Sequence, residues 1–274
     1  IQGLHLQRPE ANEKGWLRPP FFFSGAITMV ERTALQPLQR RPQVASNFKE
    51  YSMRNLFLGA GLALTALFGV PAMAAEDFQA GKQYTELRTA QPVSVPGKIE
   101  VVEVFWYGCP ACNMFEGVLK PWAEKLPEDV HFVQVPAQFN EVLNLHARLY
   151  STLEVLKVEA KVHEAVFAGI HQKKDPRVTP ARDGRQVTLP TPEQLADFVA
   201  EQGVDKALFL KTYDSFAVRN RLAKADKLVR SYQITGVPEL VVNGKYRIEL
   251  QKAGGFEQML QIADFLIKKE RATQ

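Results

Sequence analysis

The chain has 274 residues, two cysteines and a formal net charge of +4. The excess of basic residues lies entirely in residues 1–74, because from residue 75 onward Lys and Arg equal Asp and Glu in number. A neutral chain offers no basic surface for nucleic acid, which argues against nucleic-acid binding. The roughly 200 residues after position 74 suffice for one hydrophobic core, or for one domain that carries an insertion.

Residues 53–74 have the organisation of a secretory signal peptide. Arg54 supplies a positive charge, Leu56–Val70 is an uncharged apolar stretch, and Ala72-Met73-Ala74 matches a small-residue cleavage site. The apolar stretch would form a helix of about 22 Å, shorter than the hydrocarbon core of a membrane. We therefore expect cleavage after Ala74 and export, with an uncleaved anchor as the alternative.

Residues 1–52 show no sustained periodicity and precede the complete signal peptide. They begin with Ile1 and contain the breakers Pro-Pro and Arg-Arg-Pro. We interpret them as disordered or as a non-native extension of the reading frame. The natural start is then Met53, with Met29 as the second choice.

The chain after the signal peptide begins with strand and helix signals in alternation. Lys82–Leu87 and Ile99–Phe105 are predicted strands, separated by proline and glycine residues. A helix is predicted from Cys109 to about Leu126, and Val130–Val135 forms the next strand. The order strand, helix, strand predicts a βαβ unit with a right-handed crossover, and hence an α/β fold.

The middle of the chain is predicted to be helical. Apolar residues recur at steps of three and four over Val142–Leu156 and again over Val162–Ile170. Asp175–Pro192 contains several prolines and an Asp-Gly pair, so we expect a loop there. Three more helices are predicted over Thr191–Gly203, which opens with a capping box, Lys206–Tyr213 and Phe216–Tyr232.

The chain ends with signals for a hairpin and a helix. Glu239–Val242 and Lys245–Leu250 are predicted strands, joined by Asn243-Gly244, the pair typical of a type I′ turn. An amphipathic helix is predicted from Phe256 to about Leu266. Strand signals at both ends therefore enclose the helical block.

Cys109-Pro110-Ala111-Cys112 contains both cysteines and lies where a strand meets a helix N-terminus. Unpaired backbone N–H groups and the helix dipole at that point stabilise a thiolate, the reactive form of cysteine. Residues three apart lie on one helix face, so the two sulfurs can open and close a disulfide. Pro110 suits a first helical turn because its missing N–H would have had no partner there. The pattern predicts a redox-active dithiol.

Two other roles for the cysteines are alternatives to a redox-active dithiol. A zinc site needs two further ligands, but the histidines are scattered without a pair at metal-ligand spacing, so no metal is expected. A structural disulfide across so short a loop would remove little chain entropy and would stabilise almost nothing. With a zinc site and a structural disulfide both disfavoured, we expect a redox role.

Three segments are the most distinctive: VFWYGCP at 104–110, TGVP at 235–238 and VNGKY at 242–246. Their order and spacing resemble the DsbA family of bacterial periplasmic thiol:disulfide oxidoreductases. The resemblance covers the chain from residue 75 onward and implies a thioredoxin-like fold with an inserted helical domain. It implies the segments 75–140 and 231–274 for the two parts of the thioredoxin-like domain, and 141–230 for the insertion.

The resemblance also implies roles for individual residues. Cys109 corresponds to an exposed nucleophile that forms mixed disulfides, and Cys112 to a partly buried resolving thiol. Pro238 corresponds to a cis-proline that faces the dithiol, and Val237 before it would offer backbone groups to an extended substrate. The family's best-known members have His where this chain has Ala111, which puts the redox strength in question.

Glu103 interrupts an apolar strand and corresponds to a buried acid of the family. Such a carboxylate would have a raised pKa and could relay the proton of Cys112, whereas an outward-facing strand residue is the alternative. The resemblance implies that Glu116, one helical turn beyond Cys112, is a second residue whose charge influences the dithiol. We expect a substrate groove to include Trp106, Tyr107, Pro110 and Ala111, with simple core packing as the alternative for the two aromatic residues.

We therefore expect a periplasmic enzyme that donates the Cys109–Cys112 disulfide to unfolded exported proteins with free thiols. It would need no bound cofactor, and a membrane partner resembling the quinone-coupled DsbB would reoxidise it. A reductase or isomerase on the same fold is one alternative. A non-catalytic peptide-binding module with a structural disulfide is another.

Overall fold

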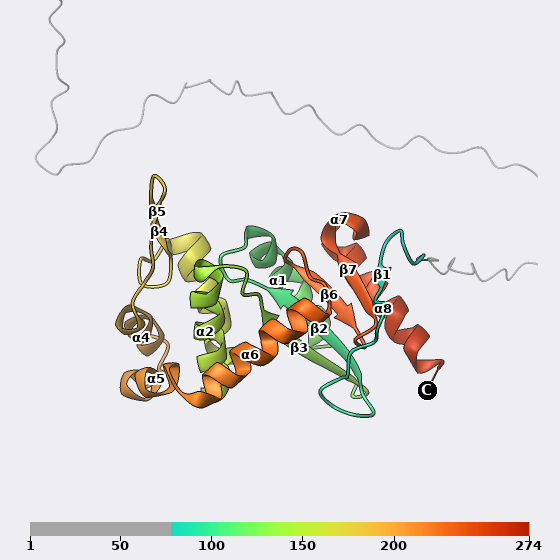
Figure 1. Ribbon diagram of the computed structural model, residues 1–274, viewed down its shortest axis with the longest axis horizontal. Coiled ribbons are helices and arrows are strands. Elements are labelled where there is room, and N and C mark those ends of the chain that lie inside the picture. The colour runs from blue at the N-terminus through green and yellow to red at the C-terminus, as the bar shows by residue number, and fades with distance from the viewer. Residues whose placement is uncertain (1–77, 274) are drawn as a thin grey trace, which may run out of the picture. The chain divides into compact units, whose positions relative to one another are not determined.

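The computed structural model describes residues 78–273 of the chain (Figure 1). The predicted extension 1–52, the signal peptide 53–74 and its cleavage site lie outside the described residues. None of the helices within the described part combines the length and the apolar content that a membrane span requires.

A five-stranded sheet forms the centre of the described part (Figure 1). In spatial order its strands are β1 (Thr85–Glu86), β7 (Tyr246–Glu249), β6 (Glu239–Val242), β2 (Ile99–Phe105) and β3 (Val130–Pro136). β2 and β3 are parallel, and the other neighbours are antiparallel. Helix α1 (Pro110–Ala123) connects β2 to β3, which confirms the predicted strand, helix, strand unit with parallel strands.

The two faces of the sheet bury different residues of β2, because side chains alternate along a strand. Val101 packs with residues of α1 and of α8 (Phe256–Arg271), whereas Val102 packs with residues of α6 (Phe216–Ser231). Every residue of β2 is buried, including Glu103. By the same alternation Glu103 shares the face of Val101, which is the face that α1 covers.

A helical insertion separates β3 from β6 (Figure 1). Before α6 it consists of α2 (Glu141–Leu156), α3 (Glu159–Ala168), the π-helix η1 (Gly169–Lys173), α4 (Pro192–Ala200) and α5 (Lys206–Tyr213). Its core, which includes Leu149, Val162 and Phe209, is continuous with Phe105 and Cys112. The insertion therefore packs against the end of β2 that carries the dithiol. The residue limits given above for the three segments stay predictions.

The predicted starts of α4, α5 and α6 are confirmed by their capping residues, whereas α4 ends at Ala200 and not at Gly203. Thr191 forms the predicted capping box with Gln194: each side chain bonds the backbone of the other residue. The helix then begins at Pro192, whose fixed φ suits the first turn. Asp205 and Ser215 accept backbone N–H groups at the starts of α5 and α6 in the same way.

Two strand predictions need correction. Within Lys82–Leu87 only Thr85–Glu86 forms a strand, because only these two residues pair with β7. The predicted strand Lys245–Leu250 ends at Glu249, and the chain turns at once into the short helix α7 (Leu250–Ala253).

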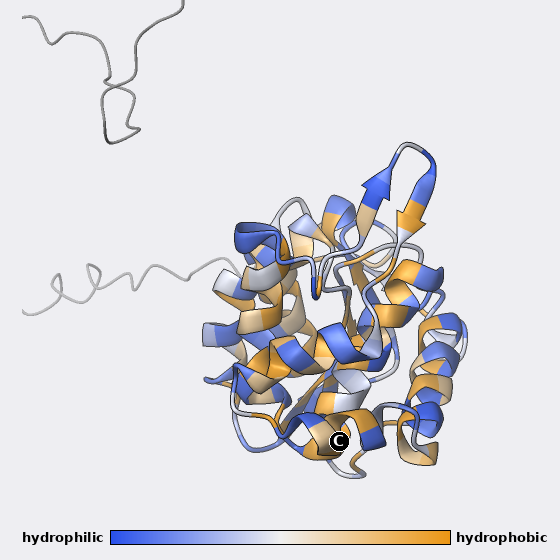
Figure 2. Cartoon of the chain, turned by 90° about the vertical axis from the view of Figure 1, so that its left-hand side faces the viewer, coloured by the Kyte–Doolittle hydropathy of each residue, from blue (hydrophilic) through white to orange (hydrophobic). Residues whose placement is uncertain are grey.

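The segment Asp175–Pro192 was expected to be a loop, but it contains an exposed hairpin of β4 (Ala181–Asp183) and β5 (Gln186–Thr188). Gly184 makes the turn with a φ of +57°. Strands of three residues are too short for alternation to reveal them in the sequence. The hairpin projects from the helical insertion in Figure 1, and Figure 2 shows that its tip is hydrophilic.

The turn between β6 and β7 agrees with its sequence signature. Asn243 and Gly244 both have positive φ, +50° and +63°, as a type I′ turn requires. The carbonyl of Gly244 also accepts a hydrogen bond from the backbone N–H of Gln91 at 2.9 Å. This contact holds the segment before β2 against the hairpin.

We expect Gly244→Ala to lower the free energy of unfolding by about 2–4 kcal/mol. A Cβ at this position would lie 2.2 Å from the backbone O of Gln91, in addition to the cost of the positive φ. Gly184→Ala is the matched control, because its φ is similar but nothing lies within 4 Å of the added Cβ; it should cost about 1–2 kcal/mol. Equal losses in denaturant titrations of the two variants would contradict the steric role of Gln91.

Candidate active site

Cys109 is the N-cap of α1 and not a residue of its first turn. Its Sγ accepts the backbone N–H of Cys112 at 3.2 Å, and Pro110 occupies the first helical position, as predicted. A sulfur in this place faces the positive end of the helix dipole. Hydrogen bonding from the Cys112 thiol and from the backbone N–H groups of Cys112 and Ala111 lowers the pKa of Cys109 to about 7, against the opposing effect of burial.

Cys112 has the opposite environment. Its side chain is completely buried, and burial raises its pKa well above the usual value of a thiol. The hydrogen bond to Cys109 and the negative charges of Cys109 and Glu103 act in the same direction. Both cysteines are free thiols in this structure. The pair is therefore asymmetric: one sulfur is stabilised as a thiolate and the other as a thiol.

The expectation of an exposed nucleophile needs correction, because Cys109 is only 7% exposed. Its thiol donates a hydrogen bond to the carbonyl O of Val237 at 3.4 Å, so the loop before β6 covers part of the sulfur. Cys109 is still the more accessible of the two sulfurs, since Cys112 has no exposed surface. A substrate sulfur must therefore approach Cys109 beside Val237.

The Val237–Pro238 peptide bond is cis, as the resemblance implied. The buried carboxylate of Glu239 organises the loop before this bond, because its Oε1 accepts the backbone N–H groups of Thr235 at 3.2 Å and Gly236 at 2.9 Å. The loop consequently presents the Val237 carbonyl to the nucleophile. The sequence analysis did not predict this role for Glu239.

Glu103 is buried without exposed surface, which rules out the outward-facing alternative. Its Oε2 accepts a hydrogen bond from Gln134 Nε2 at 2.8 Å, and its Oε1 has no partner among the described residues. Burial raises the pKa of Glu103 well above the ordinary carboxylic value, and the negative charge of Glu116 raises it further. Of the main interactions that affect this pKa, only the hydrogen bond from Gln134 lowers it.

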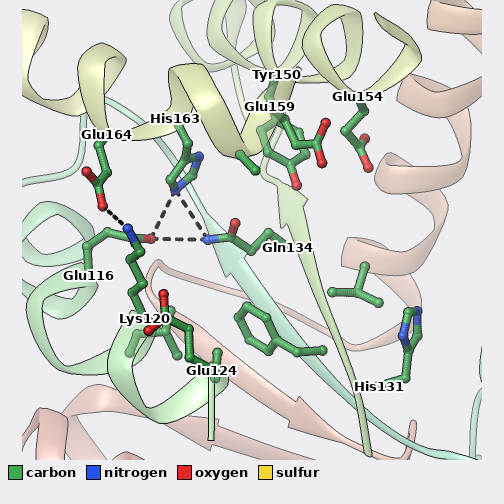
Figure 3. Close-up of a pocket in the computed structure, with 15 residues that line it drawn as sticks. Glu116, Lys120, Glu124, His131, Gln134, Tyr150, Glu154, Glu159, His163 and Glu164 are labelled. Atoms are coloured by element: carbon green, nitrogen blue, oxygen red, sulfur yellow. Dashed lines mark hydrogen bonds and ion pairs between the residues drawn. The ribbon is translucent and has the colours of Figure 1, made fainter. Parts of the chain in front are cut away.

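Gln134, which bonds Glu103, converges with Glu116 and His163, and Figure 3 shows these three side chains pointing toward one another. Gln134 Nε2 lies 3.1 Å from Glu116 Oε1, and His163 Nε2 lies 3.2 Å from the same oxygen. A cavity of about 520 Å³ is lined in part by these three residues. Glu116 thus belongs to the predicted electrostatic surroundings, but Gln134 and His163 were not predicted.

The side chain of Tyr107 does not line a surface groove, contrary to expectation. It is 1% exposed, and its hydroxyl lies 2.9 Å from His163 Nδ1. Burial raises the pKa of Tyr107 well above its usual value, so the hydroxyl stays protonated. Because the carboxylate of Glu116 can only accept, the hydrogen that joins it to His163 lies on Nε2, and Nδ1 can then accept from the Tyr107 hydroxyl.

Trp106 is partly buried, and a relay of hydrogen bonds fixes its ring. The indole N–H donates to His146 Nδ1 at 2.9 Å, and His146 Nε2 donates to the carbonyl O of Val178 at 2.9 Å. Burial lowers the pKa of His146 to about 4, so its imidazole is neutral and can accept from the indole. Ala111 is partly buried and packs on the helical core, whereas Pro110 is exposed beside Cys109.

The unpredicted residues of the site come from segments distant in sequence. Gln134 pairs with Glu103 across the parallel β2–β3 ladder, and His146 and His163 come from the insertion. A polar residue within the apolar strand β3 was the one available signal, and its meaning depends on the strand register. Within residues 78–273, no three His, Cys, Asp or Glu side chains gather as a metal site.

Residues 100–266 match the family model of the DSBA-like thioredoxin domain. The Thiol:disulfide interchange protein DsbA of Pseudomonas aeruginosa is 53% identical over 220 residues, which cover 80% of this chain and 98% of the relative. The protein of the same name from Azotobacter vinelandii is 51% identical over 226 residues, covering 81% of this chain and 100% of the relative.

Solved structures give the same result. The crystal structure of Pseudomonas aeruginosa DsbA matches with a TM-score of 0.66 and 53% identity, covering 73% of this chain and 97% of that chain. The structure of the oxidoreductase DsbA from Xylella fastidiosa matches with a TM-score of 0.64 and 34% identity, over 71% of this chain and 98% of that chain. The fold, the paired thiols and these relatives agree: the chain belongs to the DSBA-like thioredoxin family, and its activity is thiol:disulfide interchange.

Proposed function

We propose that this member of the family is a periplasmic oxidant, which donates the Cys109–Cys112 disulfide to newly exported proteins. The observation that carries the proposal is the asymmetry of the two thiols. The pKa of Cys109 is lowered to about 7 and that of Cys112 is raised. Stabilising the thiolate of one cysteine stabilises the reduced protein, so the disulfide form is the better oxidant.

The reaction begins when a substrate thiolate attacks Sγ of Cys109 in the disulfide. The bond between the substrate sulfur and Cys109 forms, the Cys109–Cys112 bond breaks, and Cys112 leaves with the electron pair. A second substrate thiolate then attacks the substrate sulfur of the mixed disulfide, and Cys109 leaves as a thiolate. The substrate loses two electrons to the protein and gains one disulfide.

Glu103 serves in this proposal as the proton donor and acceptor of Cys112. Burial makes the Cys112 thiolate unfavourable, so it needs a proton as it leaves. The raised pKa of Glu103 keeps a proton available on a neighbouring carboxyl group. In reoxidation the same carboxylate takes the proton back, which frees Cys112 to attack the mixed disulfide formed with Cys109.

The polypeptide substrate would lie along the loop that presents Val237 and Pro238, pairing with its backbone. Pro110, Ala111 and Trp106 would form the neighbouring surface. After each turnover a quinone-coupled membrane protein resembling DsbB would reoxidise the pair. These steps would take place in the periplasm, to which the predicted signal peptide would deliver the protein.

The redox state of the pair in cells tests the direction of electron flow. Rapid acid quenching followed by thiol alkylation should find Cys109 and Cys112 oxidised in the periplasm. A pair that is mainly reduced in otherwise unperturbed cells would instead indicate the reductase or isomerase alternative. Loss of substrate oxidation in Cys109→Ser would also separate the enzyme from a peptide-binding module, which would keep its function.

We expect iodoacetamide at neutral pH to modify Cys109 before Cys112 in the reduced protein. With a pKa of about 7 roughly half of Cys109 is thiolate, whereas Cys112 is buried and protonated. Peptide mapping by mass spectrometry after brief labelling identifies the modified residue. In the control Cys109→Ser, Cys112 should react only after unfolding. Initial labelling of Cys112 in the native protein would reverse the two roles.

We expect Glu103→Gln to be more stable than the unmodified protein, by a margin that grows as pH rises. The folded-state pKa of Glu103 is raised, so its folded form retains a proton that the unfolded chain loses above about pH 4. Stability therefore falls as pH rises above that value, and Gln removes this loss. Thermal unfolding across the acidic and neutral range measures the margin, with Glu124→Gln, at an exposed position on the helix C-cap, as the control.

The same Glu103→Gln variant should oxidise a peptide dithiol at least about tenfold more slowly, because it cannot give a proton to Cys112. Stopped-flow kinetics of the oxidised protein measure the rate. An unchanged rate at every pH, together with the stability gain, would mean that Glu103 has no part in proton transfer.

We expect Ala111→His to lower the pKa of Cys109 and to make the disulfide more oxidising. An imidazolium beside the thiolate adds a stabilising charge that the alanine side chain lacks. Titration of the ultraviolet absorbance of the thiolate, together with redox equilibration against glutathione, measures both quantities. Ala111→Gln is the neutral control, and an equal shift in that variant would contradict an electrostatic effect. On this account the present protein is a weaker oxidant than relatives with His at this position.

A further inference from the structure

A second cavity, of about 290 Å³, lies on the side of the active site that faces the insertion. Gly108 and Pro110, the two neighbours of Cys109, are among its lining residues. Lys174, which follows η1, and Arg182 and Val187 of the β4–β5 hairpin line it as well. The cavity therefore connects the nucleophile's immediate surroundings with the hairpin, which the proposed mechanism does not use.

The register of the hairpin determines which of its charges reaches the cavity. Arg182 on β4 pairs with Val187 on β5, and both residues line the cavity. Their sequence neighbours Asp183 and Gln186 form the next pair, and side chains of successive pairs point to opposite faces. Asp183 is not among the lining residues, so the hairpin presents an arginine to the cavity and an aspartate away from it.

The two cations at the cavity are available for a ligand. Neither Lys174 nor Arg182 has an ion pair or a side-chain hydrogen bond within residues 78–273, and both are exposed. Arg177, only three residues from Lys174, is in contrast paired with Asp175 and Glu201. No Asp or Glu of the described residues lines the cavity. Its charge is therefore positive and uncompensated.

The wall formed by Trp106 is rigid and adds no negative charge. The chain of hydrogen bonds through His146 fixes the indole, and the low pKa of His146 keeps that imidazole neutral. Val187 and the indole supply apolar surface beside the two cations. A preformed site that combines apolar walls with a few charged groups is suited to a side chain of opposite charge.

We propose that this cavity binds acidic residues that flank the reacting cysteine of a polypeptide substrate, and that it makes the enzyme prefer such sequences. The proposal rests on the proposed function, because the polypeptide must be held at Cys109. Val237 contacts Cys109 Sγ on one side, while Gly108 and Pro110 join Cys109 to the cavity. An extended chain advances about 3.3 Å per residue, so positions a few residues from the substrate cysteine reach the cavity.

The test uses two peptides, each with one pair of cysteines. The acidic peptide carries Glu at the positions three and four residues from the first cysteine, and the basic peptide carries Lys at the same two positions. The peptides are otherwise identical. Stopped-flow measurements give the rate at which the oxidised full-length protein oxidises each peptide. The ratio of the two rates is compared between the protein and its variants. Because each peptide's own thiol reactivity is common to all proteins, it cancels in this comparison.

The ratio of the rate for the acidic peptide to the rate for the basic peptide should be about fivefold higher, or more, in the unmodified protein than in the double variant Lys174→Glu/Arg182→Glu. The double variant should also oxidise the basic peptide faster than the unmodified protein does, which a misfolded variant would not do. High salt should reduce the difference, because it screens exposed charges. Arg185→Glu, in the turn of the same hairpin and not among the lining residues, is the matched control and should keep the original ratio.

An unchanged ratio in the double variant would overturn the proposal. An equal change in Arg185→Glu would overturn it too, since the effect would then come from the overall charge of the hairpin and not from the cavity. Oxidation of dithiothreitol by the unmodified protein separates a failure of the cavity assignment from a failure of the proposed function. If dithiothreitol is oxidised and the peptide ratio does not respond, only the cavity assignment fails; if dithiothreitol is not oxidised, the proposed function fails and the cavity assignment with it.

Discussion

The hydrogen bond from the backbone N–H of Cys112 to Sγ of Cys109 is the contact on which the chemistry of the site depends. It exists because Cys109 caps α1, so its sulfur occupies the place that Ser or Asp takes in other helices. A negative sulfur satisfies an N–H group that would otherwise have no partner, and it faces the positive end of the helix dipole. The same helix turn places Cys112 in the core, where a thiolate is unfavourable. The start of α1 thus stabilises Cys109 as a thiolate and Cys112 as a protonated thiol.

The sheet and the insertion support this geometry from two directions. Alternation along β2 places Glu103 on the face covered by α1, and the β2–β3 ladder brings Gln134 beside it. The insertion adds His163, which contacts Glu116 on the exposed side of the same group of residues. The buried acid therefore accepts one hydrogen bond, from Gln134 on β3, and its other oxygen has no partner among the described residues.

The insertion also shapes the surface around the nucleophile. His146 holds the indole of Trp106 while remaining neutral, and the exposed cations Lys174 and Arg182 line the same cavity as this ring. The thioredoxin-like part therefore supplies the two sulfurs, and the insertion supplies much of the lining of the cavity beside Cys109.

The sequence by itself determined the elements whose signals are local: the α/β order, the capped helices, the type I′ turn and the dithiol at a helix start. Glu103 was indicated by the resemblance of the sequence to the family, because the residue pattern alone also allowed an outward-facing position. The hairpin within Asp175–Pro192 escaped detection because three-residue strands have no measurable period. The partners Gln134, His146 and His163, and the burial of Tyr107, were decided only by the tertiary structure. Strand register and the packing of the insertion bring these residues together, and such contacts between distant segments leave no periodic pattern in a single sequence.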